Sequence, residues 1–232
     1  LRIRGAGGTS INVMLNGIPY NDSESQATFF VNVADLTSSA SQIVIQRGVG
    51  TSSNGVSAFG ASVNVITKNP ANEFYFKTDN SYGSFNTYKY SAEIGSGKLW
   101  KDRLSLMGRY TTIHSDGYID RAFSDLNSYN FSTLFEENKT KIRFLAFGGK
   151  EKTYQAWNGI TKENWETNPK YNTSGAIYDA NWENIVGFYD NETDNYRQNH
   201  YQLLWEQNLS NHWNLETTFH YTKGKGFYEN YK

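Results

Sequence analysis

One long segment of the chain concentrates side chains that could recognise a ligand. Between Tyr154 and Asn195 lie eight aromatic residues interspersed with asparagines. Rings stack on planar groups and amides exchange hydrogen bonds, so this composition is typical of non-covalent binding. A disordered segment would be poor in aromatics, which predicts an ordered loop. The candidate ligand contacts are Trp157, Trp165, Tyr171, Tyr178 and Trp182.

The same rings have a second interpretation that the sequence leaves open. Aromatic residues of a long loop also pack the loop onto its neighbours, without touching any ligand. The sequence does not separate the two roles for any single ring of the segment.

Residues for covalent chemistry are missing from the pattern. The four histidines lack the spacing of metal ligands, and no serine lies in a nucleophile elbow. The chain has no cysteine, which excludes disulfides and thiolate metal sites. The glycines at 5–8 and 48–50 do not precede a Lys-Ser/Thr pair that opens a helix, so we interpret them as turns. We predict no enzymatic activity, no metal site and no cofactor.

Composition points to strands with one aromatic face. Aromatic residues make up 16% of the 232 residues, yet the mean hydropathy is low at −0.68. A formal net charge of −1 gives no electrostatic footprint for nucleic acid. No apolar run approaches the roughly 20 residues that a membrane helix needs, whereas strands of a β-barrel need no such run.

From residue 73 onward, apolar and polar residues alternate with a period of two. In one segment, for example, Tyr201 and Leu203 flank Gln202. The alternation predicts seven strands, centred on residues 74–79, 88–95, 104–110, 129–135, 142–147, 201–209 and 213–221.

The predicted connections alternate in length. Short turns are expected at 99–102, 137–139 and 210–212, and longer ones at 114–125 and 154–195. Outer-membrane barrels have short periplasmic turns and long extracellular loops, so the long segment should face outward. Seven strands in lipid would leave an unpaired edge, so we expect the chain to be an excerpt of a longer protein.

Residues 1–70 form a different, glycine- and serine-rich module. Its predicted strands are Ile11–Leu15, Ile43–Gln46 and Ser62–Thr67. A turn cluster at 69–72 marks the expected boundary, which gives domains of residues 1–70 and 71–232.

Five blocks of the module occur in a characteristic order. They are Ile3-Arg4-Gly5, Val13 to Pro19, Ile43 to Gly48, Gly55, and Ala61 to Lys68. Together they resemble the plug and early barrel of TonB-dependent outer-membrane transporters. Asn16 stands where the family usually has Asp, Val44 where it often has Glu, and Ala61 where Gly is common.

The resemblance implies a mostly β fold. A small mixed α/β plug would be followed by antiparallel transmembrane strands from a barrel of about 22 strands. The chain would hold the second half of the plug and roughly the first third of that barrel.

The resemblance also implies a function and a location. These would be TonB-dependent transport of a scarce nutrient complex, such as a ferric siderophore or haem, across the outer membrane of a Gram-negative bacterium. The implied partners are outer-membrane lipid and the TonB-ExbB-ExbD complex, whose contact segment would lie outside this chain. The sequence pattern of the glycan-importing subgroup is missing.

Further site residues follow from the resemblance. Plug loops of this kind point toward the outer vestibule, which makes ligand contacts of Asn21, Phe29, Phe30, Thr51, Ser52 and Asn54. Arg4 and Arg47 would anchor the plug through charge pairs with glutamates of the lumen, namely Glu93, Glu206 and Glu216. Two alternatives stay open: a plug-bearing receptor that senses or adheres without transport, and a soluble β-sandwich that binds carbohydrate through Trp and Tyr.

Overall fold

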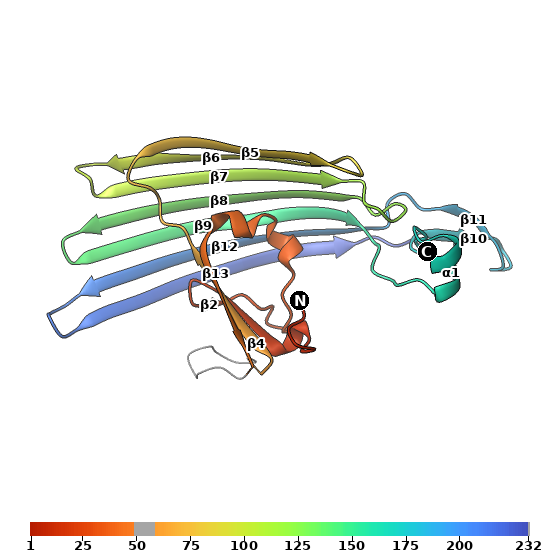
Figure 1. Ribbon diagram of the computed structural model, residues 1–232, viewed down its shortest axis with the longest axis horizontal. Helices are drawn as coiled ribbons and strands as arrows, with labels where there is room; N and C mark the ends of the chain where they lie inside the picture. The colour runs from red at the N-terminus through yellow and green to blue at the C-terminus, as the bar shows by residue number, and fades with distance from the viewer. Residues whose placement is uncertain (49–58, 232) are drawn as a thin grey trace. The chain divides into compact units, whose positions relative to one another are not determined.

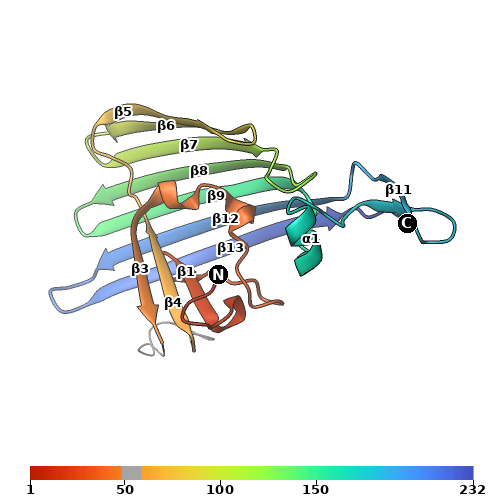
Figure 2. The ribbon, with the colours of Figure 1, turned by 45° about the vertical axis from the view of Figure 1, so that its right-hand side comes forward.

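The computed structural model describes residues 1–48 and 59–231. Two compact units make up the chain (Figures 1 and 2). The N-terminal unit comprises residues 1–30 and 35–70, and the sheet unit comprises residues 31–34 and 71–232. None of the described helices is both long enough and apolar enough to cross a membrane.

The N-terminal unit contains a four-stranded sheet in the order β2-β1-β4-β3. Its central pair, β1 and β4, is parallel, whereas the outer pairs β1–β2 and β3–β4 are antiparallel. All five residues of β1 are buried, in agreement with its apolar sequence. The three predicted strands are present, and β2 is an addition. The bounds are β1 Ile11–Leu15, β2 Ile18–Pro19, β3 Ala40–Arg47 and β4 Ala61–Thr67.

The described helices that precede β3 are short 3-10 helices: η1 Gly8–Ser10, η2 Phe30–Val33 and η3 Leu36–Ser39. Residues 31–33 of η2 belong to the sheet unit.

Asn16 and Gly17 form the two-residue turn between β1 and β2. Both residues have positive φ, 55° and 79°, which is the geometry that Asn-Gly hairpins favour. The Asn16 Oδ1 atom also accepts hydrogen bonds from the Thr67 backbone N–H at 2.9 Å and from its hydroxyl at 3.0 Å. An Asp would supply the same acceptor, so the substitution in the family pattern keeps the interaction.

The sheet unit contains seven antiparallel strands in the order β13-β12-β9-β8-β7-β6-β5 (Figure 1). All seven predicted strands are present and most extend further than the alternation indicated. Their bounds are β5 Phe74–Gly83, β6 Thr87–Leu99, β7 Leu104–Ser115, β8 Ser124–Glu137, β9 Thr140–Tyr154, β12 Thr193–Asn208 and β13 Asn214–Tyr228.

The sheet has an aromatic face and a polar face. On the aromatic face, exposed rings follow one another across strands, and Tyr201 stacks on Tyr221 with ring centroids 6.3 Å apart. On the polar face, the hydroxyls of Ser91 and Thr111 lie 2.8 Å apart. Phe147 belongs to the polar face, where it is buried and stacks on His200 at 4.7 Å. This placement explains why the alternation of β9 is blurred in the sequence.

The connections differ between the two ends of the sheet. Residues 100–103, 138–139 and 209–213 turn at one end, here called the turn end. Residues 84–86, 116–123 and 155–192 lie at the other, the loop end, on the right in Figure 1. The predicted separation is present, except that the β5–β6 connection at the loop end is also short.

The Asn16 turn gives a first prediction. Replacing Asn16 with Ala removes the acceptor for Thr67 and places a Cβ-bearing apolar residue at positive φ. We expect a loss of about 2–3 kcal/mol in local stability, whereas Asn16→Asp should stay close to the wild type. Hydrogen exchange of the Thr67 amide in the full-length protein measures the effect. Unchanged protection in the Ala variant would show that other contacts hold this turn.

Candidate functional site

The candidate site is the loop cluster, defined as residues 116–123 and 155–192 at the loop end. The longer loop is ordered, as predicted, and contains regular elements. These are helix α1, Lys162–Thr167, and a hairpin of β10, Ala176–Tyr178, and β11, Ile185–Phe188. Thr161 caps α1 by accepting a hydrogen bond from the Asn164 backbone N–H at 3.2 Å.

Arg121 joins the two loops. Its guanidinium lies 3.7 Å from the ring centroid of Phe188 and 5.9 Å from that of Tyr154. The Nη2 atom donates to the backbone carbonyls of Asn172, at 2.5 Å, and Ser174, at 3.4 Å. The guanidinium thus combines stacking on an aromatic ring with hydrogen bonds from Nη2 to two carbonyls, which are the two kinds of contact that a planar guanidinium favours. Arg121 therefore fixes the position of the hairpin relative to residues 116–123.

Asn172 makes a second link between the loops. Its Nδ2 atom donates to the carbonyls of Asp120, at 3.1 Å, and Gln155, at 3.0 Å, and its Oδ1 atom accepts from the Ser174 N–H. The side chain is buried and its amide is occupied by these contacts. Asn172 consequently has a structural role within the loop cluster.

Ring contacts extend the cluster to the β5–β6 turn. Phe85 of that turn meets Tyr118 edge-on, with centroids 5.6 Å apart. The Lys170 ammonium lies 5.4 Å from the Tyr118 ring. Cation–π and edge contacts of this kind are worth about 0.5–1.5 kcal/mol each. All three connections at the loop end thus hold one another.

Several predicted ligand contacts project from this framework. Trp157 and Trp165 are each 62% exposed, Trp182 is 79% exposed, and Tyr171 is half-buried. Within the described residues, the structure brings two of the predicted rings into contact: Tyr178 and Trp182 stack with centroids 5.9 Å apart. This pair forms a flat aromatic surface at the tip of the β10–β11 hairpin.

Asp179 organises the hairpin tip between those rings. Its carboxylate accepts hydrogen bonds from the Asn184 side chain at 2.8 Å and from the backbone N–H groups of Glu183 and Asn181. The hydrogen bond from Asn184, followed by that from the Glu183 N–H, lowers the pKa of Asp179. The Trp182 N–H donates to the Asp179 carbonyl at 3.0 Å, which supports Trp182 at its positive φ of 62°.

The N-terminal candidates have different environments. Asn21 Oδ1 accepts from the Val13 N–H at 2.7 Å, and its Nδ2 donates to the carbonyls of Ile11 and Gln26, both at 2.9 Å. The amide is therefore used within its own unit, and its ligand contact stays a prediction. Phe29 and Phe30 are exposed. Thr51, Ser52 and Asn54 lie outside the described residues.

Each of the three predicted anchoring glutamates has a polar partner within the sheet unit. Glu93 accepts a hydrogen bond from the Tyr75 hydroxyl at 2.8 Å, and Glu216 accepts one from the Asn214 amide at 2.9 Å. Glu206 forms an ion pair with Lys141 at 3.5 Å. Arg4 occupies a tight turn with φ of 49°, and Arg47 ends β3. Charge pairs between these arginines and glutamates stay a prediction.

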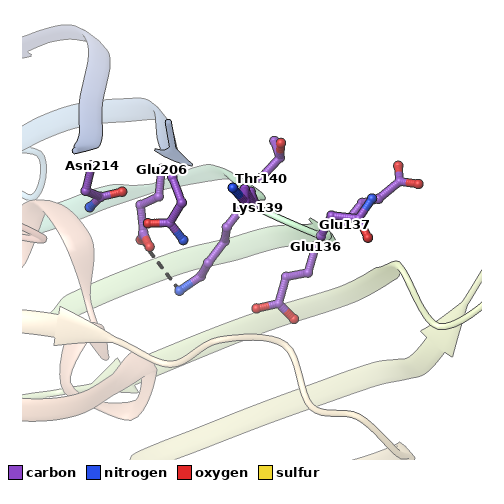
Figure 3. Close-up of a pocket in the computed structure, with 9 residues that line it drawn as sticks. Glu136, Glu137, Lys139, Thr140, Glu206 and Asn214 are labelled. Atoms are coloured by element: carbon purple, nitrogen blue, oxygen red, sulfur yellow. Dashed lines mark ion pairs between the residues drawn. The ribbon is translucent and has the colours of Figure 1, made fainter. Parts of the chain in front are cut away.

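A hollow of about 330 Å³ lies at the turn end (Figure 3). Glu206 and Lys141 pair across it, while Glu136 pairs with Lys98 at 3.0 Å. Its lining carries mixed charge without any ring, unlike the loop cluster. No three His, Asp or Glu side chains of the described residues are grouped as metal ligands would be. The lining residues are Glu136, Glu137, Asn138, Lys139, Thr140, Lys141, Glu206, Asn208 and Asn214.

Comparison with solved structures identifies the class of fold, which is that of outer-membrane receptors. The ferric-catecholate import receptor Fiu of E. coli K12 matches with a TM-score of 0.71 and 18% identity, over 98% of this chain and 31% of that one. The siderophore receptor PiuA of Acinetobacter baumannii matches with a TM-score of 0.69 and 15% identity, over 97% of this chain and 30% of that one. The alcaligin outer-membrane receptor FauA of Bordetella pertussis matches with a TM-score of 0.69 and 15% identity, over 94% of this chain and 31% of that one.

These TM-scores, at identities below 20%, show a shared fold: a plug-like sheet followed by antiparallel strands of a partial receptor barrel. The chain spans about a third of the length of these receptors. No protein-family model and no curated protein matches the chain. The likeness covers nearly the whole chain, so the β-sandwich alternative is not retained.

A prediction on Arg121 follows from its contacts. Arg121→Ala removes both the ring stacking and the carbonyl hydrogen bonds, so we expect residues 172–189 to open more easily, by about 2 kcal/mol. Arg121→Lys should give an intermediate result because an ammonium lacks the planar fork. Hydrogen exchange across 172–189 in the full-length protein measures this. Arg103→Ala, which breaks the Glu137 ion pair at the turn end, is the control, and equal exchange in both Ala variants would contradict the assignment.

Asp179 gives a pH prediction. The pKa of its carboxylate is lowered in the folded hairpin, so its stabilising contribution is present above the unfolded pKa and is lost as the pH falls through the folded pKa. We expect the fluorine NMR signal of 5-fluorotryptophan at Trp182 to shift in acid, with a midpoint below the ordinary Asp value of 3.8. Asp179→Asn should abolish the transition, and a transition that persists in that variant would exclude Asp179 as its cause.

Proposed function

We propose that this chain is part of a TonB-dependent transporter that imports a ferric siderophore, or a related iron chelate or haem, across the outer membrane. The observation that supports the proposal best is the succession of the two units. The fold of both, in this order, is shared with ferric-catecholate and alcaligin receptors over 98% and 94% of the chain. The plug-like motif order in residues 1–70 agrees with this assignment.

The remaining parts of the proposal concern the whole protein. The chain spans about a third of the receptors that it resembles, so energy transfer from TonB-ExbB-ExbD would use a segment outside it. The exposed aromatic face of the sheet would contact outer-membrane lipid. Transport rearranges non-covalent contacts, so we assign no catalytic reaction to this chain.

Within the protein, we assign the first ligand contact to the loop cluster. Its exposed rings, above all the stacked Tyr178 and Trp182, offer a flat apolar surface to planar groups of a chelate. Arg121 and Asp179 hold that surface in place before a ligand arrives, which lowers the entropic cost of binding. Asn21, Phe29, Phe30, Thr51, Ser52 and Asn54 are the proposed contacts on the plug side.

Ligand binding by the full-length protein in detergent micelles tests the proposal. A panel of radio-iron-labelled siderophores and haem, with cobalamin and oligosaccharides as non-iron competitors, should reveal tight binding of one iron chelate. Trp182→Ala should raise its Kd about tenfold or more, because truncating a central Trp costs on the order of 2 kcal/mol. Trp100→Ala is the matched control, because that ring is 64% exposed but follows β6 at the turn end.

The outcomes separate the alternatives. Chelate binding that Trp182→Ala leaves unchanged would remove the loop cluster from the site and keep the transporter. Binding without energy-dependent uptake by cells would favour a receptor that senses its ligand. Absence of binding by every iron compound would overturn the proposed ligand class.

A further inference from the structure

Five cations gather on the aromatic face of the sheet at its loop end. They lie in three adjacent strands, β9, β12 and β13, which run side by side in Figures 1 and 2. We call this set the cation cluster. Its members are Lys150, Lys152, Arg197, Lys223 and Lys225.

The strand register places the five side chains close together. Lys150, Arg197 and Lys225 are direct partners across the three strands and form one row. Lys223 lies one row nearer the turn end, opposite Asn199, and Lys152 lies one row farther out, opposite Asn195. Paired strands are about 5 Å apart and a two-residue step is about 7 Å, so the cluster covers roughly 10 by 14 Å.

The charges of the cluster are not neutralised by the described protein. Like charges directly opposite each other destabilise a sheet. Lys150, Arg197, Lys223 and Lys225 form no ion pair with any described residue, and Lys152 donates to the neutral Asn191 amide at 3.1 Å. Three of these side chains directly oppose one another in one row, and an external anion would relieve their repulsion.

The nearby acidic groups are occupied elsewhere. Asp125 is the cross-strand partner of Lys152, but its carboxylate contacts the His114 ring nitrogen at 2.6 Å. Glu229 follows β13, and its carboxylate contacts the side chains of Asn191 and Thr193. The cluster therefore keeps a strong positive character.

The position of the cluster relative to the apolar band decides what kind of anion fits. The stacked pair Tyr201 and Tyr221 lies in the row just below Lys223, toward the turn end. Tyr201 and Leu209 are eight residues apart, which corresponds to about 27 Å along the strand. At a strand tilt near 40°, this is about 20 Å along the membrane normal. This height is comparable to the roughly 25 Å apolar band of a membrane barrel. At the opposite margin, Leu209 and Trp213 are exposed.

We propose that the cation cluster binds the phosphate groups of an anionic lipid headgroup in the outward leaflet. The inference rests on the proposed membrane location and assigns a site distinct from the loop cluster. A row of aromatic rings followed directly by cations complements an acyl chain that ends in a phosphate. A soluble anion would use the cations alone and would gain nothing from the adjoining apolar rows.

The test uses the full-length protein in nanodiscs of zwitterionic lipid. The probe is fluorescent diphosphorylated lipid A, with the dephosphorylated form as comparison. The triple variant Lys150→Gln, Arg197→Gln, Lys225→Gln should lose about 100-fold in affinity, since each cation near a membrane surface contributes roughly fivefold. Wild type should prefer the diphosphorylated probe by a similar factor.

A second triple variant controls for net charge and folding. Lys77→Gln, Lys101→Gln, Lys139→Gln removes three exposed cations outside both the cation cluster and the loop cluster and should bind the probe as wild type does. Equal losses in both variants, or equal binding of the dephosphorylated probe, would overturn the site. Full competition by inorganic pyrophosphate at probe concentration would overturn its assignment to lipid.

Iron-chelate binding, measured in the same samples, separates this inference from the proposed function. Retained chelate binding with lost lipid selectivity supports the cation cluster as an independent site. If the Lys150, Arg197 and Lys225 triple variant keeps both chelate binding and lipid affinity, the lipid site is refuted while the proposed transporter function stands. Failure of wild type to enter nanodiscs would refute the membrane location and the lipid site together.

Discussion

The register of the seven antiparallel strands is the constraint on which the other features depend. Side chains alternate strictly between the two faces, so a slip by one residue in any strand would exchange its faces. The pairing of Tyr201 with Ala146 and Tyr221 puts aromatic residues next to aromatic residues, and the pairing of Arg197 with Lys150 and Lys225 puts cations together. The same ladder sends every second connection to the loop end. The pairing register of the backbone thus determines the face of each side chain, the distribution of charge and the end at which each loop lies.

The loop cluster shows how irregular chain becomes a fixed surface. The guanidinium of Arg121 stacks on the Phe188 ring and donates hydrogen bonds to the backbone carbonyls of Asn172 and Ser174. Asn172 uses an amide in the same way. A buried amide is costly unless it is paired, and the amide of the buried Asn172 is paired with backbone groups, as is the Nη2 atom of the half-buried Arg121. The exposed rings of the hairpin tip consequently project from a framework that is held at several points.

Local patterns predicted the strands, because alternation and turn residues act over a few positions. The seven strands, the order of the plug-like motifs and the separation of turns from loops could be read this way. The alternation is interrupted at Leu145 and Phe147, because both side chains are apolar yet lie on the polar face of β9. Arg121 was missed because its carbonyl acceptors lie 51 and 53 residues away in sequence. Asn21 shows the converse limit: its residue type permits ligand contact, but the fold uses its amide within β1 and the following loop.

The length of residues 155–192 has a consequence for how such a protein changes over evolution. The entropic cost of closing a loop grows with the logarithm of its length, so replacing a three-residue turn by this 38-residue connection adds only about 2 kcal/mol. The β9–β12 ladder on either side runs without interruption from Thr193 to Gln207. Insertions and deletions between those strands can therefore accumulate without disturbing the sheet. The proposed recognition surface is free to diversify without altering the strand pairing of the sheet that carries it.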